Sequence, residues 1–190
     1  FALQVAAAIV SHSWGYVDPV PVPQSLALAI ENVHQNGRGG RGALVLFAAG
    51  NDDRAINDDE LQAAEGVFTI GAINNFEDQT PFTNTGRAID LVAPTGTLTT
   101  DIAGAEGDSP DDYTSTFGGT SSACPVAAGV AGLLVSAAPD RTAPELYEVM
   151  IRTARLAPYA NPDENGHDLI FGFGIIDPPA ALRDLLGLPD

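Results

Sequence analysis

A serine that follows two glycines and precedes an apolar run is the part of this sequence best suited to chemistry. The segment Gly118–Pro125 reads Gly-Gly-Thr-Ser-Ser-Ala-Cys-Pro, and the run Val126–Ala138 after it predicts a buried helix. Ser121 would then lie at a helix N-terminus, where unpaired backbone N–H groups and the helix dipole favour developing negative charge. The glycines allow a tight turn and the close approach of a substrate backbone. These features suit a nucleophilic serine, although a serine that only caps a core helix would share them.

An asparagine after an apolar strand could complete such a site. The strand predicted over Ala43–Ala48 is followed by Ala49, Gly50 and then Asn51. Open α/β sheets build their active sites beyond the carboxyl ends of parallel strands. The side-chain N–H of Asn51 could donate to an oxyanion, together with the backbone N–H of Ser121. A turn asparagine after a glycine is the purely structural alternative.

Short apolar runs alternate with longer helical patterns, which predicts an α/β fold with a mostly parallel central sheet. Strands are predicted over Ala6–Ser13, Ala43–Ala48, Val67–Ile73 and Ile89–Ala93. Helices are predicted over Ser25–Gln35, 121–137, 143–153 and 179–186, and a long loop over Thr97–Ser115. The segment Gly37–Gly42 matches a dinucleotide-binding glycine pattern. A helix precedes it and a strand follows, which reverses the order that this motif requires.

Composition limits the remaining possibilities. The chain has 190 residues, 45% of them apolar, which indicates one domain or a large part of one around a packed core. Its 25 acidic and 8 basic residues give a net charge of −17, which argues against binding to nucleic acid. Such a charge suits solubility, calcium or basic substrates. Cys124 is the only cysteine, which we predict to be buried. No uninterrupted apolar stretch has the roughly 18 residues that a membrane span requires.

Six motifs, in family order, resemble the subtilisin-like serine proteases. Gly119–Pro125 resembles the family's serine motif, and Ala48–Asn51 resembles its oxyanion-asparagine segment. Ser13-Trp14-Gly15 is similar to the substrate-binding strand, in the form typical of the kexin and proprotein convertase branch. Three further segments resemble other parts of the domain: Pro81–Gly86, Ile89–Pro94 and Gly172–Asp177. The resemblance implies that residues 1–190 are the C-terminal portion of one peptidase domain, a three-layer α/β/α sandwich whose N-terminal part is absent from this chain.

The resemblance also implies a role for each residue of the motifs. Ser121 would attack the peptide bond of a peptide or protein substrate and form an acyl-enzyme, and Asn51 would stabilise the oxyanion. Two segments would bind the substrate. Ser13, Trp14 and Gly15 would pair with its backbone as an added strand. Ala48, Ala49 and Gly50 would enclose its side chain. Family members of this kind imply an extracellular or periplasmic location.

The catalytic Asp and His of the family are missing from this sequence. Both should precede the serine, in D-[ST]-G and H-G-[TS] segments, and neither segment occurs. Of the three histidines, His12 falls in a predicted strand, His34 on a helix face turned to solvent, and His167 in a turn. An upstream segment, or a fragment separated by autoprocessing that remains associated, would supply the Asp and His. The alternative is a catalytically inactive binding or structural subunit. The joint presence of Ser121 and Asn51 favours the first explanation.

Acidic residues near the predicted cleft suggest a specificity and a metal. Asp18 stands five residues after Ser13, where kexin-like relatives carry an acid that helps to recognise a basic side chain. The resemblance therefore implies cleavage after basic residues. Carboxylate oxygens also bind Ca²⁺, with Asp18, Asp58 and Asp59 as the candidate ligands. Solvated loop charges are the alternative for these three side chains.

Overall fold

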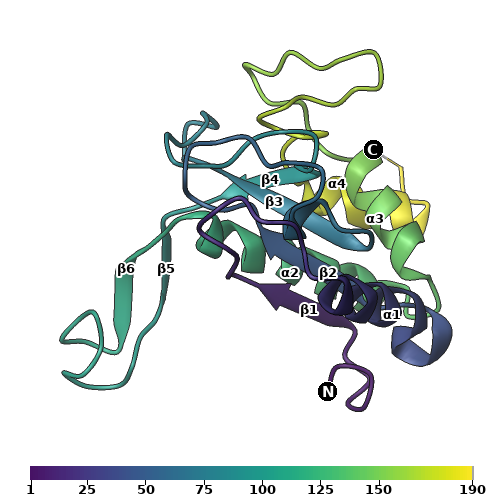
Figure 1. The fold of residues 1–190 in the computed structure, drawn as a ribbon, viewed down its shortest axis with the longest axis horizontal. Coiled ribbons are helices and arrows are strands. Elements are labelled where there is room, and N and C mark those ends of the chain that lie inside the picture. Colours follow the sequence, from purple (N-terminus) through teal and green to yellow (C-terminus); the bar gives the residue numbers. More distant parts are fainter. Residues whose placement is uncertain (190) are drawn as a thin grey trace.

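Four parallel strands form the centre of the computed structural model, which describes residues 1–189 (Figure 1). They lie side by side in chain order: β1 (Ile9–His12), β2 (Leu44–Ala48), β3 (Val67–Ile73) and β4 (Leu91–Pro94). The register places Ile9 beside Leu44, Val45 beside Val67, and Ile70 beside Leu91. Because all four strands run in one direction, their carboxyl ends share one edge, where Ser13 and Asn51 follow β1 and β2.

Helices cover both faces of this sheet, which confirms the predicted three-layer α/β/α sandwich (Figure 1). α1 (Gln24–Gly40) lies on one face, and α2 (Thr120–Ala137), α3 (Ala143–Arg152) and α4 (Pro178–Leu186) lie on the other. A short 3₁₀ turn, η1 (Leu61–Ala63), precedes β3. Alternation along the fully buried β2 divides the core in two. Leu44, Leu46 and Ala48 pack under α2, α3 and α4, whereas Val45 and Phe47 pack with α1 and η1.

α2 is the central helix of the domain, because it contacts all four strands. Its apolar side chains are buried against the sheet, and Cys124 is fully buried, as predicted. Within residues 1–189, α2 is the one helix whose length and apolar composition would suit a membrane span. Its packing against the sheet is that of a core helix in a globular domain.

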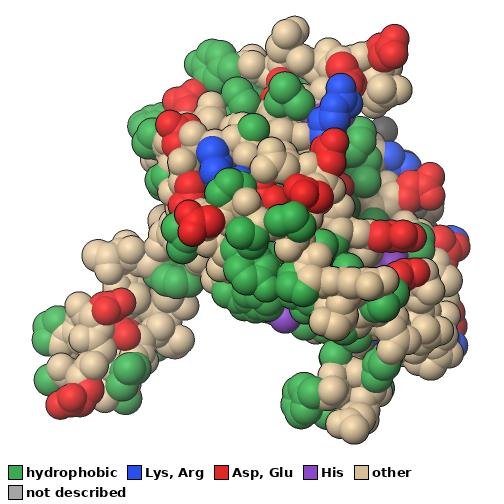
Figure 2. Space-filling view, in the orientation of Figure 1, with side chains coloured by type: hydrophobic (Ala, Val, Ile, Leu, Met, Phe, Trp, Pro, Cys, Tyr) green, Lys and Arg blue, Asp and Glu red, His purple; other side chains and the backbone are tan. Residues whose placement is uncertain are grey.

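The segment predicted as a loop over Thr97–Ser115 instead contains two strands. β5 (Thr97–Thr100) and β6 (Tyr113–Phe117) pair antiparallel and extend away from the body of the domain (Figure 1). β5 consists of Thr and one Leu, and β6 carries Tyr, Thr and Phe; Thr, Tyr and Phe favour extended backbone. The Gly, Asp, Ser and Pro residues between them hid this signal. Acidic side chains are scattered over the visible surface, including the end of this hairpin (Figure 2).

Element boundaries differ most around the first strand and the first helix. β1 is shorter than predicted, and α1 is interrupted by non-helical backbone at Gly37, Arg38 and Gly39. Gly42 has a φ of +79°, and a Cβ on it would lie 2.0 Å from the carbonyl oxygen of His34. The glycine-rich segment is thus a tight helix-to-strand connection, as the order of elements predicts. His34 does not simply face solvent, since its ring stacks on Tyr147 at 5.4 Å.

Tyr147→Phe is expected to lower the free energy of unfolding by about 1–3 kcal/mol. The buried Tyr147 hydroxyl accepts a hydrogen bond from Val45 N at 2.5 Å and donates one to Val45 O at 3.0 Å. Removing the hydroxyl leaves both buried backbone groups without this partner. Chemical denaturation measures the loss. The exposed Tyr159→Phe is the control, and equal stability of the two variants would contradict the expectation.

Candidate active site

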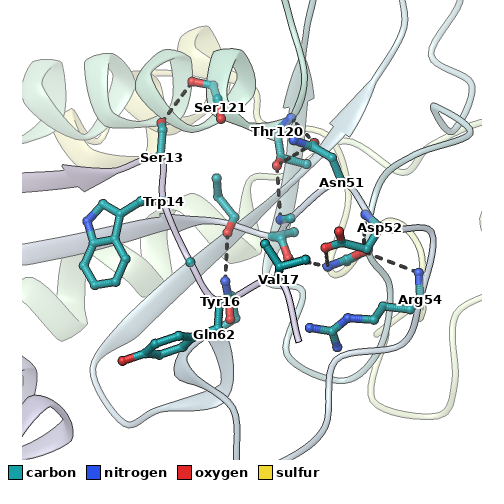
Figure 3. Close-up of a pocket in the computed structure, with 15 residues that line it drawn as sticks. Ser13, Trp14, Tyr16, Val17, Asn51, Asp52, Arg54, Gln62, Thr120 and Ser121 are labelled. Carbon is teal, nitrogen blue, oxygen red and sulfur yellow. Dashed lines mark hydrogen bonds between the residues drawn. The ribbon is translucent and has the colours of Figure 1, made fainter. Parts of the chain in front are cut away.

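Ser121 and Asn51 line one cavity of about 180 Å³ at the carboxyl edge of the sheet (Figure 3). The structure therefore brings together residues that lie 70 positions apart in the sequence. Eight of the nine residues predicted for catalysis or substrate binding line this cavity: Ser13, Trp14, Gly15, Ala48, Ala49, Gly50, Asn51 and Ser121. The ninth, Asp18, does not.

The side-chain amide of Asn51 has a defined orientation. Its Oδ1 accepts hydrogen bonds from Thr120 N at 2.8 Å and from Thr120 Oγ1 at 3.0 Å. A backbone N–H can only donate, so the atom that faces it must be the amide oxygen. The Nδ2 hydrogens of Asn51 are thereby left to donate within the cavity that Ser121 lines. Thr120, adjacent to the predicted nucleophile, is a positioning residue that the sequence interpretation missed.

Gly119 allows this arrangement at the start of α2. It has a φ of +74°, a conformation that favours glycine, and a Cβ on it would lie 3.1 Å from Asn51 Nδ2. The half-buried Ser121 follows in the first turn of the helix. A developing negative charge beside it would therefore meet the N-terminal N–H groups of α2 and the Asn51 amide together.

The segment after β1 forms the opposite wall of the cavity. Ser13 Oγ donates a hydrogen bond to Ser121 O at 3.0 Å, which ties this wall to the start of α2. The indole of Trp14 is about half exposed, and its ring lies edge-on to Phe47 at 5.4 Å. A chain segment at the cavity wall with a large aromatic surface beside it suits the binding of an extended peptide.

Within residues 1–189, no hydrogen bond joins any of the three histidine rings to Ser121. The rings make their hydrogen bonds elsewhere: His12 with Trp14, His34 with Ala43 O, and His167 with Ile89 O. His12 lies closest in sequence to the cavity wall, but its Nδ1 accepts from the Trp14 Nε1–H at 3.1 Å. The source of a base for Ser121 is therefore a matter for the proposed function.

The fluorescence of Trp14 is expected to titrate with His12. Burial lowers the pKa of His12 from its usual 6.5, and the Trp14 contact requires an unprotonated Nδ1. Because the folded-state pKa lies below the unfolded one, this contribution to stability is fully present above about pH 6.5. It is lost as the pH falls through the lowered pKa. Trp14 is the only tryptophan, so intrinsic fluorescence between pH 8 and 4 reports this change directly. His12→Gln should abolish the transition and His167→Gln should retain it, whereas a midpoint above pH 6.5 would contradict the assignment.

Asn84 holds the loop that carries Asn51. It is 2% exposed, and its amide donates to Ala49 O at 3.0 Å and accepts from Asp52 N at 2.9 Å. Gly50 must be glycine here, because it has a φ of +102° and a Cβ would lie 2.3 Å from Asn84 Nδ2. Asn84 falls within the Pro81–Gly86 motif, so the motif was the signal that could have identified it.

The acidic residues near the cavity are arranged differently from the prediction. Asp18 does not line the cavity, although Arg54 does; the hydrogen bond to Glu60 chiefly raises the pKa of Arg54, and the charge of Asp18 adds to this. Asp58 lines a separate hollow with Arg87 and Asp90. Among residues 1–189, no three Asp, Glu, His or Cys side chains gather closely enough to hold a metal ion. The structure therefore does not bring the predicted calcium ligands Asp18, Asp58 and Asp59 together, and this donor set does not fit a calcium site.

A parallel α/β/α sandwich with a serine at the start of its central helix and an oriented asparagine beside it defines a subtilisin-like domain. The chain belongs to the subtilase family, whose model matches residues 1–174. It is 32% identical to the calcium-dependent protease of Nostoc sp., over 100% of this chain and 33% of that protein. It is also 32% identical to the extracellular basic protease of Dichelobacter nodosus, over 91% of this chain and 30% of that protein.

Solved structures support the fold. The serine protease of Aeromonas sobria, in complex with its chaperone, superimposes with a TM-score of 0.81 at 20% identity, over 96% of this chain and 43% of that one. The self-cleaved protease domain of PatA gives a TM-score of 0.75 at 21% identity, over 100% of this chain and 66% of that one. The chain spans about a third of the length of the curated relatives it matches.

Proposed function

We propose that this chain is part of a serine endopeptidase that cleaves peptide or protein substrates through an acyl-enzyme on Ser121. The observation that carries the proposal is the orientation of the Asn51 amide by Thr120, which leaves its N–H groups free in the cavity beside Ser121. A serine that only capped α2 would not require an oriented donor next to it.

The chemistry follows from this arrangement. Ser121 Oγ attacks the carbonyl carbon of the scissile bond, while a base takes its proton. The negative charge that develops on the carbonyl oxygen is stabilised by Asn51 Nδ2 and by backbone N–H groups at the start of α2. The amine then leaves with a proton returned by the base. Water releases the acyl group by the same steps in reverse.

The base and its orienting Asp are proposed to come from a segment outside residues 1–190. β1 forms one edge of the four-stranded sheet, so its outer side can accept a further strand. The adjoining face of α2 also leaves Leu133 about half exposed and Gly129 open. An upstream segment, whether continuous with this chain or separated by autoprocessing, would dock there close to Ser13 and Ser121. If the missing segment docks there, residues 1–190 are the C-terminal portion of the domain, as we propose.

Labelling with a fluorophosphonate tests the proposal against a catalytically inactive binding or structural subunit. The reagent modifies only an activated serine, so the intact protein should be labelled at Ser121. Residues 1–190 alone should label far more slowly, because they lack the base. Unlabelled Ser121 in the intact protein would favour the inactive subunit.

Four finer predictions have unequal support. An extracellular location is proposed from the names of relatives such as the extracellular basic protease. Calcium is proposed for the intact protein only from relatives named calcium-dependent proteases. Membership of the kexin branch rests on the Ser13-Trp14-Gly15 motif alone. Cleavage after basic residues is left out of the proposal, because Asp18, on which it rested, does not line the cavity.

A further inference from the structure

The side chain of Gln62 closes the cavity between its two walls (Figure 3). Its Nε2 donates to Ala48 O, in one wall, at 3.4 Å. The same atom lies 2.8 Å from the position that a Cβ on Gly15, in the other wall, would occupy. Gln62 is only 8% exposed and is held on η1. A substrate side chain that enters between the small residues of the two walls therefore meets a neutral amide.

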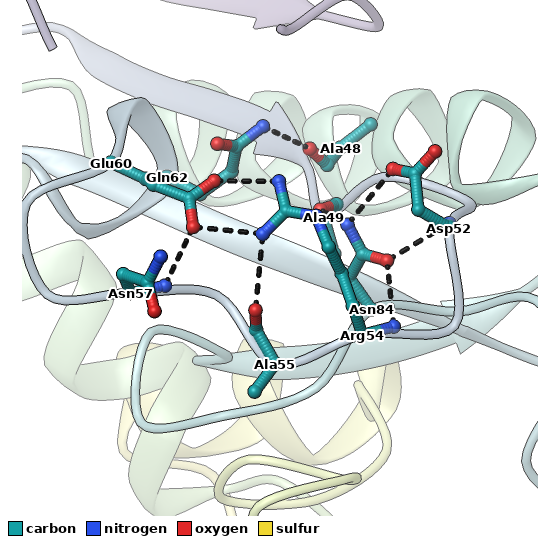
Figure 4. Close-up of polar contacts among 9 residues, drawn as sticks. All are labelled: Ala48, Ala49, Asp52, Arg54, Ala55, Asn57, Glu60, Gln62 and Asn84. Carbon is teal, nitrogen blue, oxygen red and sulfur yellow. Dashed lines mark hydrogen bonds and ion pairs between the residues drawn. The ribbon is translucent and has the colours of Figure 1, made fainter. Parts of the chain in front are cut away.

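A buried carboxylate on the same loop, that of Glu60, is already neutralised (Figure 4). Glu60 is 3% exposed, and it accepts hydrogen bonds from Arg54 Nη1 at 2.8 Å and Nη2 at 2.6 Å. It also accepts one from Asn57 N at 2.8 Å. The Arg54 guanidinium holds the pKa of Glu60 below its usual value, and Glu60 raises that of Arg54. The pair is therefore ionised and carries no net charge.

The other charges around the cavity do not favour a basic side chain. Arg54 also lines the cavity, and because it is paired with Glu60 it gives an incoming cation no attraction. Asp52 also lines it, but this residue is exposed, and a solvent-exposed ion pair contributes only about 0–1 kcal/mol. A lysine or arginine would lose hydration against the Gln62 amide without gaining a buried counter-charge.

We propose that this cavity accepts an uncharged side chain of the residue before the scissile bond, and that Gln62 determines this preference. The inference rests on the proposed endopeptidase function. The Arg54–Glu60 pair assists by withholding its carboxylate from the substrate. A carboxylate in place of the Gln62 amide would have no such partner and would face the substrate directly.

The test compares Gln62→Glu with wild type in the intact protein, on peptides that differ only in the residue before the scissile bond. Wild type should cleave after Leu or Gln at least about 10-fold more efficiently than after Lys or Glu. Gln62→Glu should raise kcat/KM for Lys relative to Leu by about 10–100-fold, through a charge-assisted contact. Gln24→Glu makes the same change at an exposed position at the start of α1 and should leave the ratio unaltered.

Two controls separate the possible failures. Fluorophosphonate labelling of each preparation reports whether Ser121 is active, so absent labelling overturns the proposed function and this inference with it. Normal labelling with a wild-type preference for Lys, Arg, Asp or Glu overturns the inference alone. If Gln62→Glu does not fold, Gln62→Leu serves instead, and it should lower cleavage after Gln relative to Leu without any gain for Lys. An unchanged ratio in Gln62→Leu would also overturn the role of Gln62.

Discussion

Ser121→Ala is expected to lower kcat of the intact protein by about 10⁶-fold, the magnitude that applies to loss of the nucleophile in subtilisin, a member of the same family. The hydroxyl is the only group of Ser121 that can form the acyl-enzyme, and alanine preserves the helix around it. The residual rate would come from substrate binding and from Asn51. Initial rates on a peptide substrate, together with fluorophosphonate labelling, measure the effect.

The matched control for this substitution is Ser136→Ala, since Ser136 is an exposed residue on the same helix. It should retain the wild-type rate. Substantial turnover in Ser121→Ala would mean that another group is the nucleophile. Circular dichroism of both variants separates a lost reaction from a lost fold.

Asn51→Ala is expected to lower kcat by about 10²–10³ while KM changes little, the range that applies to the oxyanion asparagine of subtilisin. The Asn51 amide would interact with the charge that develops in the transition state and much less with the neutral carbonyl of the bound substrate. Its loss should therefore appear in kcat. Steady-state kinetics on the peptide that wild type cleaves best gives the two parameters separately.

The exposed Asn32→Ala on α1 provides the control and should leave kcat unchanged. A rise in KM at constant kcat in Asn51→Ala would contradict the oxyanion role, because it would place Asn51 in ground-state binding. Thr120 gives an independent check on the geometry, since its two hydrogen bonds orient the same amide.

Local sequence patterns were sufficient to predict the layers of the fold. The residues of β2 and α2 form long apolar runs, which predict a buried strand and a buried helix whatever elements lie beside them. The hairpin over Thr97–Phe117 was missed because its strands are short and rich in polar residues. Pairing across a long turn depends on contacts that a window of sequence does not contain.

The site was predictable only in part, for a similar reason. Ser121 and Asn51 carry recognisable motifs, whereas Gln62, Arg54 and Glu60 lie in a loop whose composition is ordinary. The bidentate pairing of Arg54 with Glu60 makes the buried Glu60 carboxylate unavailable to a substrate. The sequence interpretation, which rested on Asp18, suggested the opposite, a cavity that accepts basic side chains.

The sequence by itself determined the family, the layered fold, and the two groups proposed to attack and to stabilise the oxyanion. Each of these depends on residues within a few positions of one another, where backbone geometry and periodicity act directly. Three findings came only from the tertiary structure. The oxygen of the Asn51 amide faces Thr120, the predicted calcium ligands do not gather into one site, and Gln62 closes the cavity. These findings depend on hydrogen bonds and charge pairs between side chains that are distant in the sequence and that only folding brings together.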